Sequence, residues 1–161
     1  MKTRNHRVWA VVGALAAAVC AVVLVLKLLK PRGEQSVDRK AMRKSQQGEL
    51  DAVAMYDALA SLVRDERDAA VFRRLSADER GHAQVFHYVS HLTLKPKMAK
   101  AILIPFLYRT IGWEKTYRLI ARGEYSAAKK YERLLSYPEV RRIQADEIRH
   151  GDMVLALIGE K

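Results

Sequence analysis

Apolar residues are distributed in two different ways along this chain. From Val8 to Leu26 no residue is charged, and two further leucines continue the apolar stretch beyond Lys27. After about residue 36, apolar positions instead recur every three or four residues among many charged ones, a pattern typical of helices that bury one face. The pattern therefore predicts a tail and membrane segment, residues 1–30, followed by a helical domain, residues 31–161.

The apolar stretch, counted as residues 8–29, predicts a single-pass transmembrane anchor. About 20 consecutive apolar residues cross the hydrocarbon core of a bilayer as a helix. A cleaved signal peptide would have a shorter apolar core, of about 7–15 residues, and a small-residue cleavage site, which does not follow here. A lipoprotein signal would need a small residue before Cys20, where the chain has Val19. More Lys and Arg follow the stretch than precede it, so the positive-inside rule places the helical domain on the cytoplasmic side.

The periodic part of the chain predicts four long helices and no strand, hence an all-α fold. The expected ranges are 36–67, 68–92, 112–136 and 138–158. Asp68 is the expected N-cap of the second helix, because its side chain can accept hydrogen bonds from the first free backbone N–H groups. Pro138 suits the first turn of the fourth helix, where a missing N–H costs no hydrogen bond.

Residues 93–112 connect the second and third helices and are apolar nearly all round. The segment contains Pro105 and is too short to span a bilayer. One interpretation is a crossover connection packed on the helical bundle. The other is a surface that enters the lipid interface through residues 98–113, with basic side chains near the headgroups and aromatic rings at the boundary. The side chains concerned are Lys95, Lys97, Lys100, Arg109, Tyr108 and Trp113.

A motif with the pattern R-R-(L/I)-x-A-D-E-x-x-H occurs twice, at residues 73–82 and 141–150. Each copy places a glutamate and a histidine three positions apart, Glu79 with His82 in the first copy and Glu147 with His150 in the second. Residues three apart on a helix lie on the same face, one turn apart. A carboxylate and an imidazole in this arrangement can bind one metal ion together.

The helices that precede these motifs also repeat each other. Gly48-Glu49 and Gly123-Glu124 both begin the pattern G-E-x-x-A-x-x-x-Y-x-x-L. The helical domain therefore consists of two helix pairs with similar sequences. At about 1.5 Å of rise per residue, each glutamate lies near the level of the motif that follows it along the bundle. In a four-helix bundle, a Glu from each of two helices and a Glu-x-x-His from each of the other two form a site for two metal ions.

Six residues of the repeats are the candidate metal ligands and the candidate catalytic centre: Glu49, Glu79, His82, Glu124, Glu147 and His150. Carboxylates and imidazoles suit iron or manganese, and no thiolate joins them to favour zinc or copper(I). Tyr56 and Tyr131 lie two turns beyond the glutamates of the first and third helices, and we expect their hydroxyl groups to hydrogen-bond carboxylates of the site. We also expect Asp78 and Asp146 to orient a ligand histidine on the neighbouring helix.

Charge and cysteine content indicate which classes of binding partner to expect. The chain has a formal net charge of +11, which favours attraction to anionic lipid headgroups. Its Lys and Arg are spread among acidic residues along the helices, with no aromatic stacking platform, so we expect no nucleic-acid binding. The single Cys, Cys20, lies in the apolar stretch, so the sequence has neither a disulfide framework nor a rubredoxin-type iron centre.

These motifs resemble the iron-binding pattern of the ferritin-like di-iron superfamily, and within it the rubrerythrin-like branch. The likeness covers about residues 36–160 and is closest in kind to the stand-alone ferritin-like domain associated with vacuolar-iron-transporter-type proteins. The resemblance implies a ferritin-like four-helix bundle of two repeated helix pairs, two iron ions as the cofactor, and the six residues above as iron ligands. It also implies oxidation of ferrous iron by O₂ or reduction of peroxide.

Two departures from the rubrerythrin pattern bear on activity. Ala127 stands one turn after Glu124, where rubrerythrins usually carry a further glutamate. The cysteine-rich rubredoxin domain that supplies electrons in that family has no counterpart in this sequence. Peroxidase turnover would therefore need a partner protein that donates electrons.

Two other functions are compatible with the same residues. Demethoxyubiquinone hydroxylases are similar in their glutamate and Glu-x-x-His pattern and in an apolar membrane-facing segment between the halves, so a quinone monooxygenase is one alternative. A non-enzymatic iron sensor or carrier is the other. The sequence leaves this choice open, and it is also compatible with a homodimer.

Overall fold

The computed structural model describes residues 32–159, and these residues are almost entirely helical. The elements are α2 (Arg32–Leu62), α3 (Glu66–Ser90), α4 (Ala99–Thr110), α5 (Trp113–Tyr131), the short 3₁₀ helix η1 (Glu132–Leu134) and α6 (Pro138–Gly159). No strand occurs among the described residues, which confirms the all-α prediction. The predicted anchor at residues 8–29 lies outside them, and none of the helices described is both long and apolar enough to cross a membrane.

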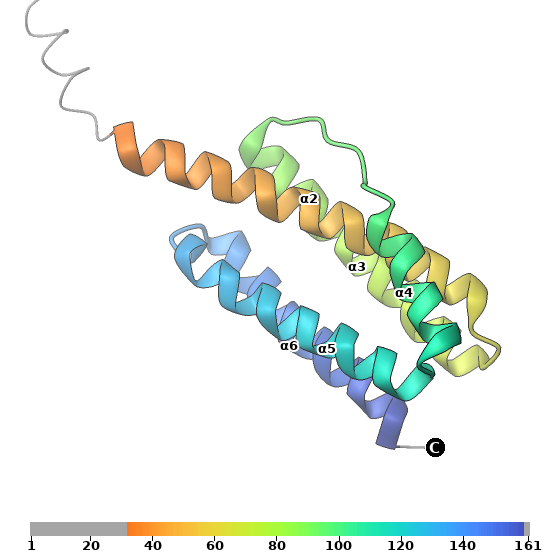
Figure 1. The fold of residues 1–161 in the computed structure, drawn as a ribbon. Helices are drawn as coiled ribbons and strands as arrows, with labels where there is room; N and C mark the ends of the chain where they lie inside the picture. The colour runs from red at the N-terminus through yellow and green to blue at the C-terminus, as the bar shows by residue number, and fades with distance from the viewer. Residues whose placement is uncertain (1–31, 160–161) are drawn as a thin grey trace, which may run out of the picture. The chain divides into compact units, whose positions relative to one another are not determined.

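The helices form two pairs joined by a crossover (Figure 1). α2 lies along α3, as shown by the stacked rings of Tyr56 and Phe72 and by the hydrogen bond from Ser76 to Asp57. α5 packs along α6, and α3 contacts α6 across the bundle. α4 lies within the predicted crossover at residues 93–112 and packs against α5. The compact unit built in this way covers residues 38–161.

The first interhelical turn differs from the prediction. α2 ends at Leu62, and the N-cap of α3 is Asp65, whose side chain accepts hydrogen bonds from the backbone N–H of Arg67 and of Asp68. The prediction that Asp68 caps this helix was therefore wrong. Asp68 is instead buried and accepts a hydrogen bond from the Tyr117 hydroxyl at 2.7 Å. Two aspartates three residues apart offer alternative caps, and the buried tyrosine partner determines which one stays inside the helix.

The other boundaries follow the sequence more closely. α5 ends at Tyr131, earlier than the predicted residue 136, because its last turn tightens into the 3₁₀ helix η1. α6 begins at Pro138, as predicted. Gly112 caps the start of α5 with a φ of 89°, a backbone conformation that glycine adopts without the steric cost borne by other residues.

Two apolar clusters fill the bundle. The larger includes Tyr56, Leu59, Phe72, Tyr117 and Val154, and the smaller includes Met42, Phe86, Tyr131, Val140 and Ile143. On each of the four long helices the candidate ligands lie in sequence between residues of one cluster and residues of the other. The packing therefore sets a polar layer between two apolar ones.

α4 differs from an ordinary surface helix, because apolar residues lie on its exposed side as well as on its buried side. Ala101 and Ile104 are buried against the bundle, as the crossover interpretation expects. On the opposite side Ile102, Leu103 and Phe106 are 69%, 53% and 58% exposed. The helix thus packs through one side and presents a second apolar side outward.

Candidate metal centre

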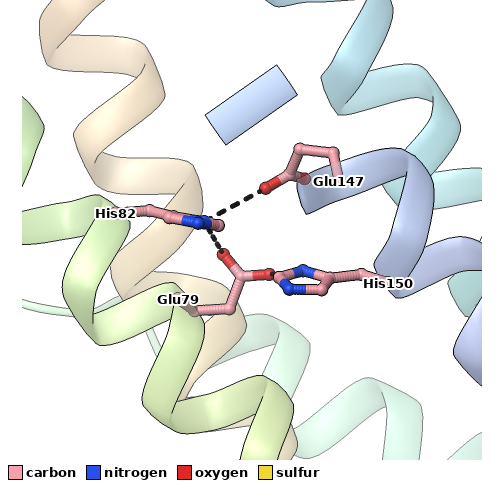
Figure 2. Close-up of side chains that lie close together, drawn as sticks. All are labelled: Glu79, His82, Glu147 and His150. Carbon is pink, nitrogen blue, oxygen red and sulfur yellow. Dashed lines mark hydrogen bonds and ion pairs between the residues drawn. The ribbon is translucent and has the colours of Figure 1, made fainter. Parts of the chain in front are cut away.

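The two copies of the repeated motif meet in the middle of the bundle. Glu79 and His82 come from α3, and Glu147 and His150 come from α6. All four side chains are buried, and one ligand atom from each lies within 4.8 Å of the others. Figure 2 shows the four side chains converging from the two helices. The spacing of three residues puts both side chains of each helix on one face, and the helix contact brings the two faces together.

The histidines turn their Nδ1 atoms toward the carboxylates. His150 Nδ1 lies 3.1 Å from Glu79 Oε1. His82 Nδ1 lies 3.4 Å from Glu147 Oε1 and 3.6 Å from Glu79 Oε2. The inner edges of both imidazoles therefore point into the same small space as the carboxylate oxygens.

The outer edge of each histidine is held by an aspartate of the opposite helix. His82 Nε2 lies 3.2 Å from Asp146 Oδ2, and His150 Nε2 lies 3.3 Å from Asp78 Oδ2. This confirms the prediction that these aspartates orient the histidines. A carboxylate accepts the Nε2–H, so in the neutral imidazole Nδ1 keeps its lone pair for a metal ion, a pattern common behind metal-bound histidines. Arg149 contacts both aspartates, at 2.6 Å and 3.4 Å.

Glu49 and Glu124 are also buried in this layer, next to the four-residue group. They do not belong to the set of ligand atoms that all lie within 4.8 Å of one another. The Tyr56 hydroxyl donates to Glu124 Oε1 at 2.5 Å, and the Tyr131 hydroxyl donates to Glu49 Oε1. The predicted tyrosine–carboxylate bonds are present, and each crosses between α2 and α5. A seven-residue separation is about 10 Å along a helix, so the facing helix offers each tyrosine a nearer carboxylate.

Burial sets the electrostatics of the layer, and the crowding of carboxylates adds to it. Burial, together with the neighbouring Glu79, raises the pKa of Glu49 well above its usual value. Burial likewise raises the pKa of Glu124, and it raises the pKa of Glu147 to about 9. Burial alone would lower the pKa of His82, but the adjacent Glu147 and Glu79 outweigh it and raise this pKa to about 10. Protons or divalent cations relieve both the cost of burying these carboxylates as anions and the repulsion among them.

Glu79 behaves differently from the other three carboxylates. Burial would raise its pKa, but the hydrogen-bonding groups of Glu49 and of the two histidines outweigh burial and hold its pKa far below the usual value. Glu79 is therefore the carboxylate that stays ionised at the middle of the layer, in contact with both histidines.

The donor set fits a metal centre. Three buried ligand atoms have no hydrogen-bond partner among the described residues: Glu79 Oε2, His82 Nδ1 and Glu147 Oε1. Buried polar atoms without partners are costly, and a shared metal ion satisfies all three together. Oxygen and imidazole ligands suit iron or manganese, and four carboxylates offset the charge of two divalent cations.

An open cleft of about 930 Å³ leads to this layer between α2 and α5. Glu49, Glu79, Glu124 and Glu147 line its inner end. Seven basic residues also line it: Lys40, Arg43, Lys44, Lys97, Lys100, Lys130 and Arg133. Of this set only Lys97 and Lys100 were expected from the sequence to have a role, near lipid headgroups. The grouping itself was not predicted, because its members come from α2, the connection before α4, α4, α5 and η1.

Comparison with known families gives one result for this chain. The family model described as Rubrerythrin matches residues 40–158, a range that contains all six candidate ligands. Searches of the curated proteins and of the solved structures found no match.

Proposed function

The chain belongs to the rubrerythrin family, and from this premise we propose that its bundle binds two iron ions and works as an oxidoreductase that oxidises ferrous iron, reduces peroxide, or does both. The observation that carries the proposal is the buried group of Glu79, His82, Glu147 and His150, in which three ligand atoms have no hydrogen-bond partner among the described residues. Glu49 and Glu124 complete the proposed ligand set from α2 and α5.

When bound, two ferrous ions would supply two electrons in total. Two electrons and two protons reduce one peroxide to two waters. Neighbouring side chains fix the proposed ligand side chains in position. Asp78 and Asp146 fix the two imidazoles through Nε2. Tyr56 and Tyr131 keep their hydroxyl protons, because burial and the nearby Glu124 or Glu49 raise the pKa of each phenol well above its usual value. Both tyrosines therefore act as donors that hold Glu124 and Glu49 in place.

The surroundings control access to the proposed centre. The two apolar clusters exclude water from the sides of the layer, which strengthens the electrostatic interactions inside it. The cleft between α2 and α5 is the route by which O₂ or peroxide reaches the carboxylates in this proposal. Repeated peroxide reduction needs an electron-donor protein, since the sequence has one Cys and no rubredoxin-type centre.

The proposal includes a membrane location. Residues 8–29 are uncharged apart from Lys27 and are long enough to anchor the bundle, and the basic residues after them favour a cytoplasmic bundle. A periplasm-dependent phosphatase reporter fused after Lys161 should remain inactive, whereas a cytoplasm-dependent fluorescent reporter should be active. The reverse pattern would contradict the orientation.

Ferrous iron added to the purified full chain in air tests the activity. We expect two irons per chain, formation of ferric absorbance, and consumption of O₂ or added peroxide. The matched variant Glu79→Ala/Glu147→Ala should show none of these above the background rate. The control Glu114→Ala/Glu139→Ala changes two exposed glutamates and should behave as the parent protein. Stoichiometric iron binding without oxidation and without peroxide consumption would overturn the oxidoreductase proposal in favour of an iron sensor or carrier.

A quinone monooxygenase is the second candidate, favoured by one observation. Ile102, Leu103 and Phe106 make an outward apolar side on α4, next to the cleft that α4 helps to line through Lys100 and Ile104. Such a surface suits delivery of a lipid-soluble ring substrate. Quinone analysis of a deletion strain tests this candidate, because a monooxygenase of this kind should leave an accumulated precursor when it is removed. An unchanged quinone pool would count against it.

A further inference from the structure

The mouth of the cleft between α2 and α5 is strongly basic. All seven basic residues that line the cleft are exposed. Within residues 39–159 none of the seven forms an ion pair, although several other arginines of the bundle do. Unpaired cations gathered around one opening attract an anion from solution.

The walls of the cleft are largely apolar, although Gln47, Asp51 and Ser126 also line it, and its inner end is acidic. The walls are formed by Met55, Ile104, Leu119, Ile120, Ala127 and Leu134, among others. At the inner end lie Glu49 and Glu124, which are 2% and 6% exposed. A negatively charged group is thus attracted at the mouth and repelled at the inner end, while an uncharged chain is accepted along the walls.

We propose that this cleft binds a single-chain anionic amphiphile, a long-chain fatty acid, with its carboxylate at the basic mouth and its uncharged chain directed toward Glu49 and Glu124. The volume of about 930 Å³ lies within the range of about 300–1,000 Å³ typical of small-molecule sites. The order of charges along the cleft fixes the direction in which the molecule lies. Lys100 and Lys130 belong to different helices, α4 and α5, so the carboxylate meets cations from more than one side.

The exposed apolar side of α4 indicates that such a molecule would reach the cleft from a bilayer. α4 contributes Lys100 and Ile104 to the cleft and exposes Ile102, Leu103 and Phe106 on its other side. An exposed apolar helix side with basic residues beside it contacts the interface of a bilayer, where fatty acids partition. Binding in the cleft does not require metal, so it can be measured whether or not the proposed function holds.

A photoactivatable palmitic acid, with its reactive group near the end of the chain, tests the proposal on the full chain in phosphatidylcholine nanodiscs without added metal. Labelled positions are mapped by mass spectrometry. We expect labelling in the inner half of the cleft, at Met55 or Ile120, which unlabelled palmitic acid displaces. Ala127→Trp fills the cleft from one wall and should abolish this labelling.

A charge variant keeps the test independent of packing. Lys130→Glu/Arg133→Glu alters two exposed positions and should weaken binding about tenfold, as expected when exposed charge interactions of up to about 1 kcal/mol each are lost or reversed. The controls are Ala70→Trp and Arg74→Glu, exposed positions on α3 that do not line the cleft. Both should retain the labelling of the parent protein.

The outcomes separate this proposal from the proposed function. Labelling confined to α4, labelling that unlabelled palmitic acid does not displace, or labelling unchanged in both cleft variants would overturn the fatty-acid site. Ferrous iron is added to parallel samples of the same preparations, and the bound iron is measured. Loss of iron binding with normal labelling would contradict the metal centre alone, and normal iron binding without labelling would contradict the cleft site alone.

Discussion

His82 in the α2–α3 half and His150 in the α5–α6 half occupy the same place in the repeated motif, yet the structure holds them differently. His150 is fully buried, and its Nδ1 lies within hydrogen-bond distance of Glu79. His82 is 6% exposed, and its Nδ1 has no hydrogen-bond partner among the described residues. The ligand types repeat between the halves, but the second half encloses its histidine more tightly.

The contacts just outside the metal layer diverge further. Arg149 precedes His150 and contacts both Asp78 and Asp146, whereas the equivalent place before His82 is Gly81. A Cβ at Gly81 would meet nothing within 4 Å, so no packing demand keeps a glycine there. The first half has its own cluster instead, in which the buried Ser76 and the exposed Arg80 donate to Asp57. Ligand chemistry constrains the layer in both halves, and the solvated surface is free to differ.

Removing one carboxylate from each half should have the largest effect. Glu79→Ala/Glu147→Ala should bind almost no iron, because it removes two of the three ligand atoms that have no hydrogen-bond partner among the described residues. Elemental analysis measures the loss, and circular dichroism checks that the helices remain. Of the single variants, Glu79→Ala should be the more damaging, since Glu79 contacts both histidines. Retention of two irons in the double variant would refute the ligand assignment.

Replacing the aspartates behind the histidines comes next. Asp78→Asn and Asp146→Asn should each weaken metal affinity about 10–100-fold, since such partners orient the ligand imidazole. Asp146→Asn should have the larger effect, because Asp146 is less exposed than Asp78 and water replaces it less well. Competition with a chelator measures both affinities. Asp152→Asn, at an exposed position that bonds Tyr125, is the control and should leave affinity unchanged.

Replacing the two buried tyrosines tests whether the two hydrogen bonds between α2 and α5 contribute equally to stability. Tyr56→Phe and Tyr131→Phe each leave a buried carboxylate without its donor, so each should lower the free energy of unfolding by about 1–3 kcal/mol. Urea unfolding followed by circular dichroism gives both values. Tyr88→Phe changes a tyrosine that is 79% exposed and should have little effect. A loss in only one of the two buried variants would show that the crossed bonds are not equivalent.

Arg149→Ala should have the smallest effect, although it removes the clearest difference between the halves. Its side chain is 48% exposed, and exposed ion pairs contribute roughly 0.2–1 kcal/mol to stability. Thermal unfolding against Arg118→Ala, an exposed arginine paired with Glu114, measures this contribution. A loss far above that of Arg118→Ala would mean that Arg149 positions Asp78 and Asp146.

The spacing of residues along the helices allowed most of the site to be predicted. Glu79 and His82 share a helix face wherever that helix packs, and the same holds for Glu147 and His150. The repeat then indicates that both faces meet, because two similar helix pairs bury the same side. The structure brings these four residues into one buried group, as the repeat implies.

The wrong helix cap and the unpredicted basic mouth of the cleft both depend on contacts between helices, which the spacing of residues along one helix does not determine. The sequence analysis expected Asp68 as the cap, but Asp65 caps the helix, and a hydrogen bond from Tyr117 on α5 keeps Asp68 inside the helix. The basic mouth of the cleft draws Lys40, Lys97 and Lys130 from separate segments. Of these three only Lys97 was expected to have a role, near lipid headgroups, and nothing local to any of them indicates that they share one opening.

The sequence by itself therefore determined the helices, the repeat and the face on which each candidate ligand lies, because these depend on contacts within three or four residues. The tertiary structure decided which residue of another helix each side chain meets. It paired Tyr56 with Glu124 and Tyr131 with Glu49, and it set an aspartate of the opposite helix behind each histidine. Those partners depend on how the helices lie against one another, which the periodicity of a single helix does not specify.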